Sequence, residues 1–346
     1  MSVVPVVRNG AAKTFLRSID ATSYEIVARG GPKAARPSIS VIVPTYERED
    51  MVAQTIDAIQ RQDIPNSAYE IIVVDNASAD GTTGVLKAKA RRSPVPFTGI
   101  RMKENLGPAV SRNAALTLAR GDLVAFTDSD CVPTGAWLRS LVIAAAQGVG
   151  VVQGHTIAHP SQPQPLFNHF IETNGLDGSF STSNVCYRRE AVEAVGGFDP
   201  GCTYWEDVDL GWRVRRAGWK AVYAPTALVH HQVIRLSAMQ WLLHAKNFSN
   251  WPAKASRYPE FRQHLFGRMW ASSWHPLFEA ALLGLVLTPV NRRFLLLTIP
   301  YLATFPVRGR LTGRAPILRA AANVARDTVS FTVLVAGSVR HRSPVL

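Results

Sequence analysis

The sequence predicts an α/β fold: a mostly parallel sheet with helices on both faces, followed by a helical, membrane-prone C-terminal extension. Three observations support this prediction. Short β-branched runs alternate with helical segments from residue 39 onward, which is typical of parallel sheets. Polar residues gather where three of these runs end, and ligands of parallel sheets bind at the carboxyl ends of the strands. Basic and apolar residues concentrate in the last third of the chain.

The alternation starts with a β-branched run, 39–43, that closes at Pro44. A segment with apolar residues at the helical period follows, and this pair of elements recurs along the chain, more weakly beyond residue 150. The expected strands are 39–43, 70–74, 97–102, 122–127, 149–157, 182–187, 222–224 and 227–229. The expected helices are 50–61, 82–92, 108–118, one from 189, 206–217, 237–255 and 320–339.

The 346 residues divide into three expected regions. Residues 1–36 form a flexible lead-in that lacks the apolar stretch of a signal peptide. Residues 37–234 form the α/β domain, and residues 235–346 form a basic, apolar helical region. The three cysteines have neither an even count nor the spacing of metal ligands, so we expect a reducing cytosol and no disulfide framework or zinc site.

The formal charge of +13 is unevenly distributed. Residues 1–234 carry 23 Lys and Arg against 22 Asp and Glu, whereas residues 235–346 carry 15 against 3. A basic segment can bind nucleic acid or an anionic membrane surface. Two neighbouring apolar runs, 277–290 and 294–307, favour the membrane and no nucleic acid.

Each apolar run is shorter than the roughly 20 residues of a straight membrane span. We therefore expect a peripheral or re-entrant helical hairpin at the cytoplasmic face of the cell membrane. The arginines expected to anchor it are Arg292, Arg293, Arg308, Arg310 and Arg314. Two core helices packed against the α/β domain are the alternative.

Two carboxylates follow the fourth expected strand. An apolar run, 123–126, leads to Asp128 and Asp130, which lie on the same side of an extended chain. Carboxylates this close repel each other unless a proton or a cation lies between them. Mg²⁺ is typically held by one or two carboxylates together with substrate phosphates, so the pair predicts a metal site for a phosphate-bearing ligand. An acidic turn after a strand is the simpler alternative.

Polar residues also follow the first two strands and precede the third helix. They are Pro44, Thr45 and Glu47, then Asp75, then Asn105 and Gly107. The N–H groups at the start of that helix could receive an anion, and Arg112 could reach the same crevice. Each group could be an ordinary turn. Their coincidence at several strand ends favours a shared ligand site.

A second acidic cluster opens the helix expected over 206–217. Glu206 and Asp207 follow Trp205, which suits a cleft, whereas Asp209 is expected to pair with a basic residue one helical turn later, Arg213.

Two adjacent histidines, His230 and His231, follow the last expected strand. Neighbouring residues of a strand point to opposite faces, so one of the two is a candidate metal ligand and the other a packed imidazole.

With these residues in view, the chain from about 39 to 231 resembles the family 2 glycosyltransferases of the GT-A fold, a Rossmann-like architecture. Six segments match the family in the same order. They are 41–46, 72–78, 105–113, 127–130, 196–199 and 205–213. The resemblance covers only the α/β part of the chain.

The resemblance implies a nucleotide-diphosphate-sugar donor and a divalent cation, Mn²⁺ or Mg²⁺. The base and ribose would lie against Pro44, Thr45, Glu47 and Asp75. Asp128 would approach the ribose and Asp130 would ligate the metal. His230 would be a further metal ligand, with His231 as the alternative.

The resemblance also implies a catalytic base. A sugar hydroxyl must lose its proton as it attacks the anomeric carbon, so a carboxylate must lie within hydrogen-bond reach. This role would fall to Asp207, with Glu206 as its neighbour and fallback, and a single attack would invert the anomeric configuration. Asn184, Trp205 and the loop 155–180 would face the acceptor, a glycan or lipid-linked precursor of the cell envelope.

One departure from the family bears on the reaction. Processive polysaccharide synthases of this family carry Gln-x-x-Arg-Trp after the acidic pair, and the segment 240–244 does not supply it. Transfer of a single sugar is therefore expected. A sugar nucleotidyltransferase is disfavoured because 44–50 contains no glycine, and a non-catalytic membrane-associated nucleotide-sugar binding protein is disfavoured by the intact Glu206 and Asp207.

Overall fold

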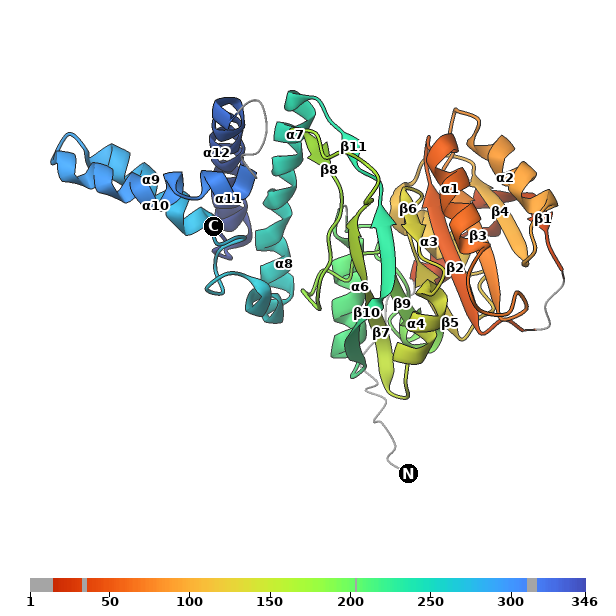
Figure 1. The fold of residues 1–346 in the computed structure, drawn as a ribbon. Coiled ribbons are helices and arrows are strands. Elements are labelled where there is room, and N and C mark those ends of the chain that lie inside the picture. The colour runs from red at the N-terminus through yellow and green to blue at the C-terminus, as the bar shows by residue number, and fades with distance from the viewer. Residues whose placement is uncertain (1–14, 33–35, 203, 310–315) are drawn as a thin grey trace. The chain divides into compact units, whose positions relative to one another are not determined.

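The computed structural model describes residues 15–32, 36–202, 204–309 and 316–346, which form two compact units (Figure 1). The first unit holds the described residues up to Pro163 together with Phe170–Ile234. The second holds Gln164–His169 and the described residues from Arg235 onward. The chain thus divides where its composition changes from charge-balanced to basic.

A nine-stranded sheet in the order β1-β4-β3-β2-β5-β9-β7-β10-β6 organises the first unit. The strands β4, β3, β2 and β5 are parallel neighbours, as are β7 and β10, whereas β1, β9 and β6 run antiparallel to the strands beside them. The bounds are β1 Tyr24–Gly30, β2 Ile39–Thr45, β3 Tyr69–Asp75, β4 Phe97–Met102, β5 Leu123–Phe126, β6 Cys131–Pro133, β7 Val149–Ala158, β9 Val185–Arg188 and β10 Lys220–His231. The expected mostly parallel α/β sheet is confirmed.

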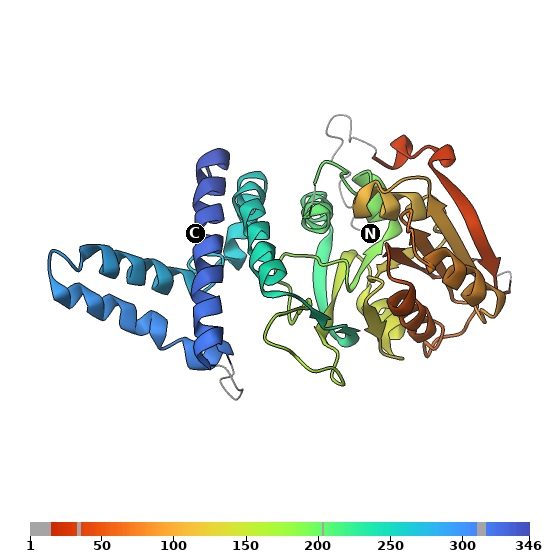
Figure 2. The same ribbon diagram turned by 90° about the horizontal axis from the view of Figure 1, so that it is seen from above.

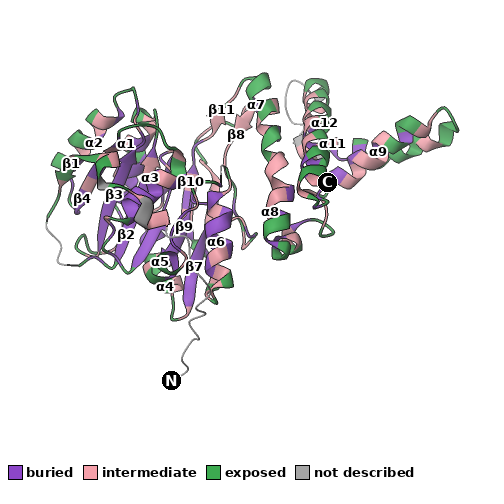
Figure 3. Ribbon diagram, turned by 180° about the vertical axis from the view of Figure 1, so that it is seen from behind, coloured by how far each residue is buried: buried purple, intermediate pink, exposed green. Residues whose placement is uncertain are grey.

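Six helices accompany the strands within this described unit. They are α1 Glu49–Ile59, α2 Thr82–Arg91, α3 Gly107–Leu116, α4 Trp137–Ala144, α5 Arg189–Ala194 and α6 Glu206–Arg216. In α1 the apolar residues Val52, Ile56 and Ile59 recur at the helical period and are fully buried, because that stripe packs into the main core. Figure 3 shows the strands of the sheet as the most continuously buried part of the unit.

The expected strands and helices of this unit are confirmed to within a few residues, and β1, β6 and α4 were not expected, nor were the short 3-10 helices η1 Phe15–Ser18 and η2 Ala21–Ser23. The flexible lead-in is wrong for Tyr24–Gly30, which form β1 and pair antiparallel with β4 along the sheet edge. The strand β6 is only three residues long, and α4 begins directly after a turn at Thr134. Short elements of this kind leave little periodic pattern in a sequence.

The second unit is helical. Its elements are α7 Ala238–His244, η3 Ala245–Asn250, α8 Trp251–Arg257, η4 Pro259–His264, α9 His275–Leu287, η5 Arg292–Thr298, α10 Ile299–Leu302, α11 Phe305–Gly309 and α12 Pro316–His341. Short strands, β8 Asn168–His169 and β11 Ile234–Arg235, form a separate two-stranded sheet. The helix expected over 237–255 appears as α7, η3 and α8 in succession. Across the described parts of the chain, every helix is too short or too polar to traverse a lipid bilayer.

The two apolar runs expected to form a hairpin do so. In Figure 2, α9 forms one arm and η5 with α10 forms the other, and the two arms lie side by side. One of the expected anchors is engaged otherwise, because Arg308 makes a two-pronged ion pair with Asp327 of α12. Arg310 and Arg314 lie outside the described residues.

Candidate functional site

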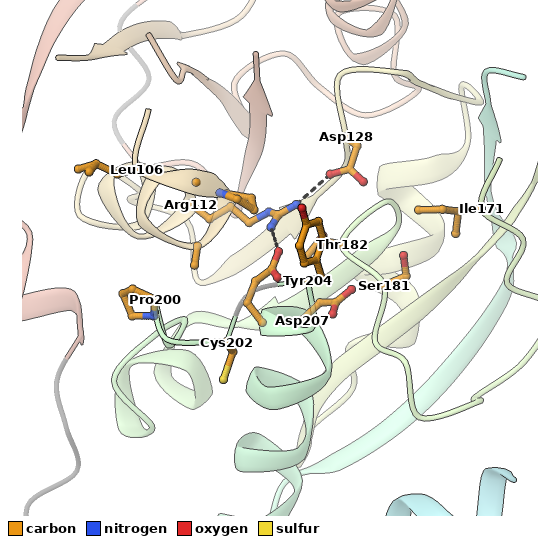
Figure 4. Close-up of a pocket in the computed structure, with 14 residues that line it drawn as sticks. Leu106, Arg112, Asp128, Ile171, Ser181, Thr182, Pro200, Cys202, Tyr204 and Asp207 are labelled. Carbon is orange, nitrogen blue, oxygen red and sulfur yellow. Dashed lines mark hydrogen bonds and ion pairs between the residues drawn. The ribbon is translucent and has the colours of Figure 1, made fainter. Parts of the chain in front are cut away.

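A pocket of about 490 Å³ opens at the carboxyl end of β5. Its walls come from the start of α3, the end of β5, the segment before β9 and the start of α6 (Figure 4). Gly107, Arg112, Asp128, Glu206 and Asp207, all expected site residues, line it together. Side chains from distant parts of the sequence thus meet where ligands of parallel sheets bind.

Arg112 lies at the centre of this pocket and joins two of its walls. Its guanidinium donates to Asp128 Oδ1 at 3.0 Å and to Glu206 Oε1 at 2.7 Å (Figure 4). Burial alone would lower the pKa of Arg112, but the carboxylates of Asp128, Glu206 and Asp207 outweigh it and raise the pKa. Arg112 therefore stays charged and fixes the strand end of β5 against the start of α6.

The pKa of Asp128 is raised, chiefly by its burial and also by the neighbouring charge of Asp130, against the opposing effect of Arg112. The ionised form of Asp128 is therefore not fully compensated by Arg112. A further cation in this region would favour ionisation of both carboxyl groups.

Glu206 and Asp207 occupy different environments although they are adjacent. Glu206 is 7% exposed and bound to Arg112. Asp207 is half-buried, lines the pocket and accepts a hydrogen bond from the backbone N–H of Val208 at 2.7 Å. Asp207 is therefore partly exposed in the pocket, as Asp128 is, whereas Glu206 is buried and holds Arg112. The pairing of Asp209 with Arg213 is confirmed at 2.7 Å.

Asp130 lies beside His231. Asp130 immediately precedes β6, and His231 ends β10, the strand that pairs with β6. In the register of β10 and β6, His231 is opposite Cys131, and Gln232 N–H donates to the Asp130 carbonyl at 2.8 Å. This pairing brings His231 Nε2 to 3.6 Å from Asp130 Oδ1. Arg48, from the loop after β2, donates to the other carboxylate oxygen, Oδ2, at 2.9 Å.

The donor atoms at this place fit a divalent cation. Asp130, His231 and Cys131 each offer a ligand atom, and all lie within 4.8 Å of one another. His231 Nδ1 lies 2.7 Å from the carbonyl of Gln232, which can only accept, so Nδ1 carries a proton and Nε2, on the side of Asp130, is the ring nitrogen that a metal would use. Burial raises the pKa of the Cys131 thiol well above its usual range, and Mg²⁺ and Mn²⁺ prefer oxygen ligands to thiolate, so Cys131 is the poorest ligand of the three. Asp130 and His231 would hold the metal.

The expectation that His230 is the metal ligand is corrected by this geometry. His230 points to the opposite face of β10, where its ring packs at 5.6 Å from that of His159. Burial, together with His159, lowers the pKa of His230. The alternation along the strand therefore assigns the position beside Asp130 to His231, the alternative left open by the sequence.

The residues expected to hold the base and ribose lie at the ends of β2 and β3, outside the lining of the pocket. Thr45 is buried with no partner for its hydroxyl oxygen within the described residues, and Glu47 is exposed with φ of 49°. Pro44 is partly exposed next to Thr45. These three remain expectations for the nucleotide.

Asp75 differs from its expected role. Its side chain is 0% exposed, and it accepts hydrogen bonds from Arg101 at 2.8 Å, from the Ser78 backbone at 2.9 Å and from the Thr83 hydroxyl. In this conformation Asp75 braces the loop after β3 and does not face a ligand. Asn105 likewise acts on the loop, because its side-chain oxygen accepts from Asn76 at 2.6 Å and from the Gly107 N–H at 3.1 Å, which fixes the start of α3.

The expectation that Asn184 faces the acceptor is wrong. Asn184 is 0% exposed, accepts from Trp137 Nε1 at 2.8 Å and donates to the carbonyls of His155 and Ala227 at 2.9 and 2.8 Å. It is a buried crosslink between strands. Trp205 precedes α6 and is partly exposed, and the residue of this segment that lines the pocket is Tyr204.

Several residues near the site were not expected from the sequence. Arg48 on Asp130 is one, and among the pocket-lining residues Ser181, Thr182 and Tyr204 are three others. Arg48 stands in the loop that follows the matched segment 41–46, so its proximity to a ligand site was available as a signal. The three others stand in irregular segments, where no periodicity indicates which way a side chain points.

Comparison with known proteins places this arrangement in a family. The profile described as "Glycosyl transferase family 2" matches residues 40–195, and that of "Glycosyl transferase family group 2" matches residues 123–308, more than half of the chain. The glycosyltransferase AglE of Haloferax volcanii is 30% identical over 207 residues, which cover 56% of this chain and 67% of that protein. The pre-mycofactocin glycosyltransferase of Mycobacterium tuberculosis is 31% identical over 238 residues, 62% of this chain but only 46% of that protein.

Two solved structures share the fold. The mannosyltransferase PcManGT of Pyrobaculum calidifontis, in complex with GDP-Man and Mn²⁺, aligns with 96% of this chain and 92% of its own at 22% identity and a TM-score of 0.56. Residues 1–349 of TarS from S. aureus, in complex with UDP, align with 88% of this chain and 92% of that one at 19% identity and a TM-score of 0.51. The sheet therefore has the GT-A-like fold. With the family profiles and the pocket, these findings show that the chain is a glycosyltransferase and belongs to glycosyl transferase family 2.

Proposed function

We propose that this glycosyltransferase moves one sugar from a nucleotide-diphosphate-sugar to a hydroxyl acceptor, with inversion at the anomeric carbon and with a divalent cation. The observation that carries the proposal is the meeting of Arg112, Asp128 and Asp207 in one pocket, next to the donor set of Asp130 and His231. PcManGT was solved with GDP-Man and Mn²⁺, and TarS with UDP, which supports a donor of this class.

The donor would lie across the carboxyl ends of β2 and β5, with its diphosphate toward Asp130. Mn²⁺ or Mg²⁺ held by Asp130 and His231 would act as a Lewis acid that stabilises the charge developing on the leaving nucleoside diphosphate. Arg48 already binds Asp130 and is positioned to contact the donor phosphates once a metal takes its place on the carboxylate. Asp128, held by Arg112, would contact the ribose.

The chain's own part in the chemistry is the removal of a proton. Asp207 would accept the proton of the attacking hydroxyl, because it lines the pocket and is partly exposed, whereas Asp128 and Glu206 are ion-paired with Arg112. The hydrogen bond from Val208 N–H to Asp207 Oδ1 and the start of α6 orient the carboxylate and stabilise its ionised form before the reaction. Glu206 is a positioning residue, because it acts on the pocket only through Arg112.

Single transfer fits the absence of the processive motif at 240–244, and the acceptor would be a glycan or a lipid-linked precursor of the cell envelope. No covalent enzyme intermediate is required, because one in-line attack on the face opposite the leaving group gives the inverted product.

The experiment starts by screening nucleotide-sugars with and without Mn²⁺ for an increase in melting temperature, because only a bound donor stabilises the folded protein. With the donor identified, Asp207→Asn should lower kcat by about 10²- to 10⁴-fold, the usual contribution of a general base, and leave the donor-induced thermal shift unchanged. Asp57→Asn, a partly exposed carboxylate on α1 paired with Lys89, is the matched control. Unchanged turnover of Asp207→Asn would remove Asp207 from the mechanism, and NMR detection of a retained anomeric configuration would exclude inversion.

A further inference from the structure

The helical hairpin of the second unit has a covered base and an uncovered tip. One arm is α9, and the other is η5 followed by α10 (Figure 2). At the base, Phe278 and Ala281 of α9 pack with Tyr301 of α10 in a small separate core. The colours of Figure 3 change along α9 from buried and intermediate toward exposed at its far end.

The two arms approach each other closely at one glycine. A Cβ on Gly284 would lie 2.6 Å from the Phe294 carbonyl oxygen and 2.9 Å from Leu297 Cβ, so only glycine permits this contact. At the turn, the Asn291 side chain accepts from Arg293 N–H at 2.9 Å and caps the returning arm. The two arms of the hairpin are therefore held together by specific contacts.

A buried polar network fixes the base of the hairpin to α12. Asp327 is 4% exposed, accepts from the Tyr301 hydroxyl at 2.7 Å and pairs with both terminal nitrogens of Arg308. These contacts fix the base of the hairpin, from which the tip extends.

The tip is apolar on its outer surface along both arms. On α9 and just after it, Val286 is 72% exposed and Val290 is 79% exposed; on the returning arm, Leu296 is 63% exposed. The other large apolar side chains exposed on the tip are Leu283, Leu285, Leu295 and Leu297, and Ile299 and Leu302 are exposed beside Tyr301 nearer the base. Nine large apolar side chains exposed on one short hairpin are more than the scattered exposed apolar residues of an ordinary surface, and they indicate a binding site for an apolar partner.

The charges at the tip are all positive. Arg292 and Arg293 lie exposed at the turn between the arms, and the sequence from 280 to 326 contains no Asp or Glu. We propose that this tip, residues 283–297, inserts into the interface of an anionic lipid membrane, with its leucines and valines among the acyl chains and its two arginines at the phosphate groups. This inference does not depend on the proposed transfer reaction.

The charge pattern favours lipid over a second copy of the chain. Two tips packed against each other would bring the arginines of both turns together, and the segment offers no carboxylate to neutralise them. Lipid phosphates supply that neutralisation, and a fluid interface can cover apolar side chains on both arms at once. Association of two copies of the chain through their tips is therefore the result that would contradict membrane insertion.

The test is flotation of the full-length chain with vesicles of phosphatidylcholine, with and without phosphatidylglycerol. The first variant, Val286→Ser with Leu296→Ser, changes two exposed side chains, so the fold should be retained. The matched control is Ile143→Ser with Met239→Ser, because these side chains are 74% and 64% exposed but lie outside the hairpin. The second variant, Arg292→Gln with Arg293→Gln, removes the charge at the turn.

The wild type and the control should float with the anionic vesicles, and the serine variant should bind them at least about ten-fold more weakly. The glutamine variant should lose roughly five-fold in partitioning for each arginine on anionic vesicles and little on neutral ones. Equal flotation of wild type and serine variant would overturn the proposal. So would a vesicle-free dimer, seen by sedimentation velocity, that the serine variant dissociates.

Discussion

Replacing His231 by alanine tests which histidine completes the metal site, and His230→Ala is its adjacent control. His231 is 2% exposed, its Nε2 lies 3.6 Å from Asp130, and its Nδ1 is fixed by the Gln232 carbonyl. His230 packs on His159 at the other face of β10. The two variants remove the same imidazole at neighbouring positions on opposite faces of the strand, where His231 is buried and His230 is partly exposed.

The size of the effect follows from the donor set. Two side chains, Asp130 and His231, provide good ligands, so His231→Ala removes one of two. Loss of a residue that only orients a ligand typically costs about 10- to 100-fold in metal affinity, and loss of a ligand should cost at least as much. We expect about 100-fold weaker Mn²⁺ binding, or ~2.7 kcal/mol, for His231→Ala and a change within about two-fold for His230→Ala.

Electron paramagnetic resonance of free Mn²⁺ during titration, with the nucleoside diphosphate of the identified donor present, measures both affinities without any turnover. Thermal unfolding of the metal-free variants checks that removal of the buried imidazole leaves the unit folded. Wild-type Mn²⁺ affinity in a folded His231→Ala protein would refute the assignment, and so would a large loss in His230→Ala.

Three further predictions use other parts of the chain. Arg48→Met removes the cation that occupies Asp130 and should strengthen Mn²⁺ binding without nucleotide by up to about five-fold, because the pair is partly exposed and worth ~1 kcal/mol at most; isothermal titration showing unchanged or weaker binding would contradict it. Asn184→Ala should lower the free energy of unfolding by about 3–5 kcal/mol, because it leaves the Trp137 N–H and the carbonyls of His155 and Ala227 without their partner. An unchanged melting temperature would show that these hydrogen bonds of Asn184 do not stabilise the fold. Burial lowers the pKa of His275, so the unfolded chain binds this proton more readily than the folded one. The free energy of unfolding of the wild type should therefore fall as the pH drops below the unfolded pKa of about 6.5. Between pH 7.5 and 5.5, His275→Gln should lose less free energy of unfolding than the wild type, as measured by chemical denaturation followed by circular dichroism. Equal losses in both proteins would rule out His275 as the source.

The sequence predicted the parallel part of the sheet because its strands are buried on both faces. Ile39–Thr45 and Tyr69–Asp75 read as continuous β-branched runs, and the helices between them keep the helical period. Tyr24–Gly30 was missed because an edge strand with exposed positions has no such run; its pairing with β4 is a tertiary interaction.

The site was predictable at the level of residue type, and less so at the level of contacts. Arg112 was expected to reach the crevice at the strand ends, where Asp128 lies, and Glu206 and Asp207 were expected at a cleft; the four residues line one pocket. Strand alternation showed that the histidines at 230 and 231 face opposite ways but could not say which faces Asp130, because that depends on the register of β10 with β6.

Burial reversed two expectations for the same physical reason. Asp75 and Asn184 are polar residues at strand ends, as ligand-binding residues often are. Each is instead hydrogen-bonded to a residue far along the chain, the partly exposed Arg101 in one case and the buried Trp137 in the other. A sequence shows the donor and the acceptor but not that they meet, and this is the information that packing adds.

The backbone pairing between β6 and β10 also bears on how such a protein can change during evolution or in the laboratory. Asp130 and His231 are joined through ladder hydrogen bonds of adjacent strands, and the long stretch of chain between them loops away and returns. Insertions, deletions or exchanged loops in that stretch would leave the two side chains where they are, provided that the two strands still pair. The segment 159–182, which contributes Ser181 and Thr182 to the pocket, is thus a place where acceptor preference can be redesigned by loop grafting while the cation-binding side chains keep their separation.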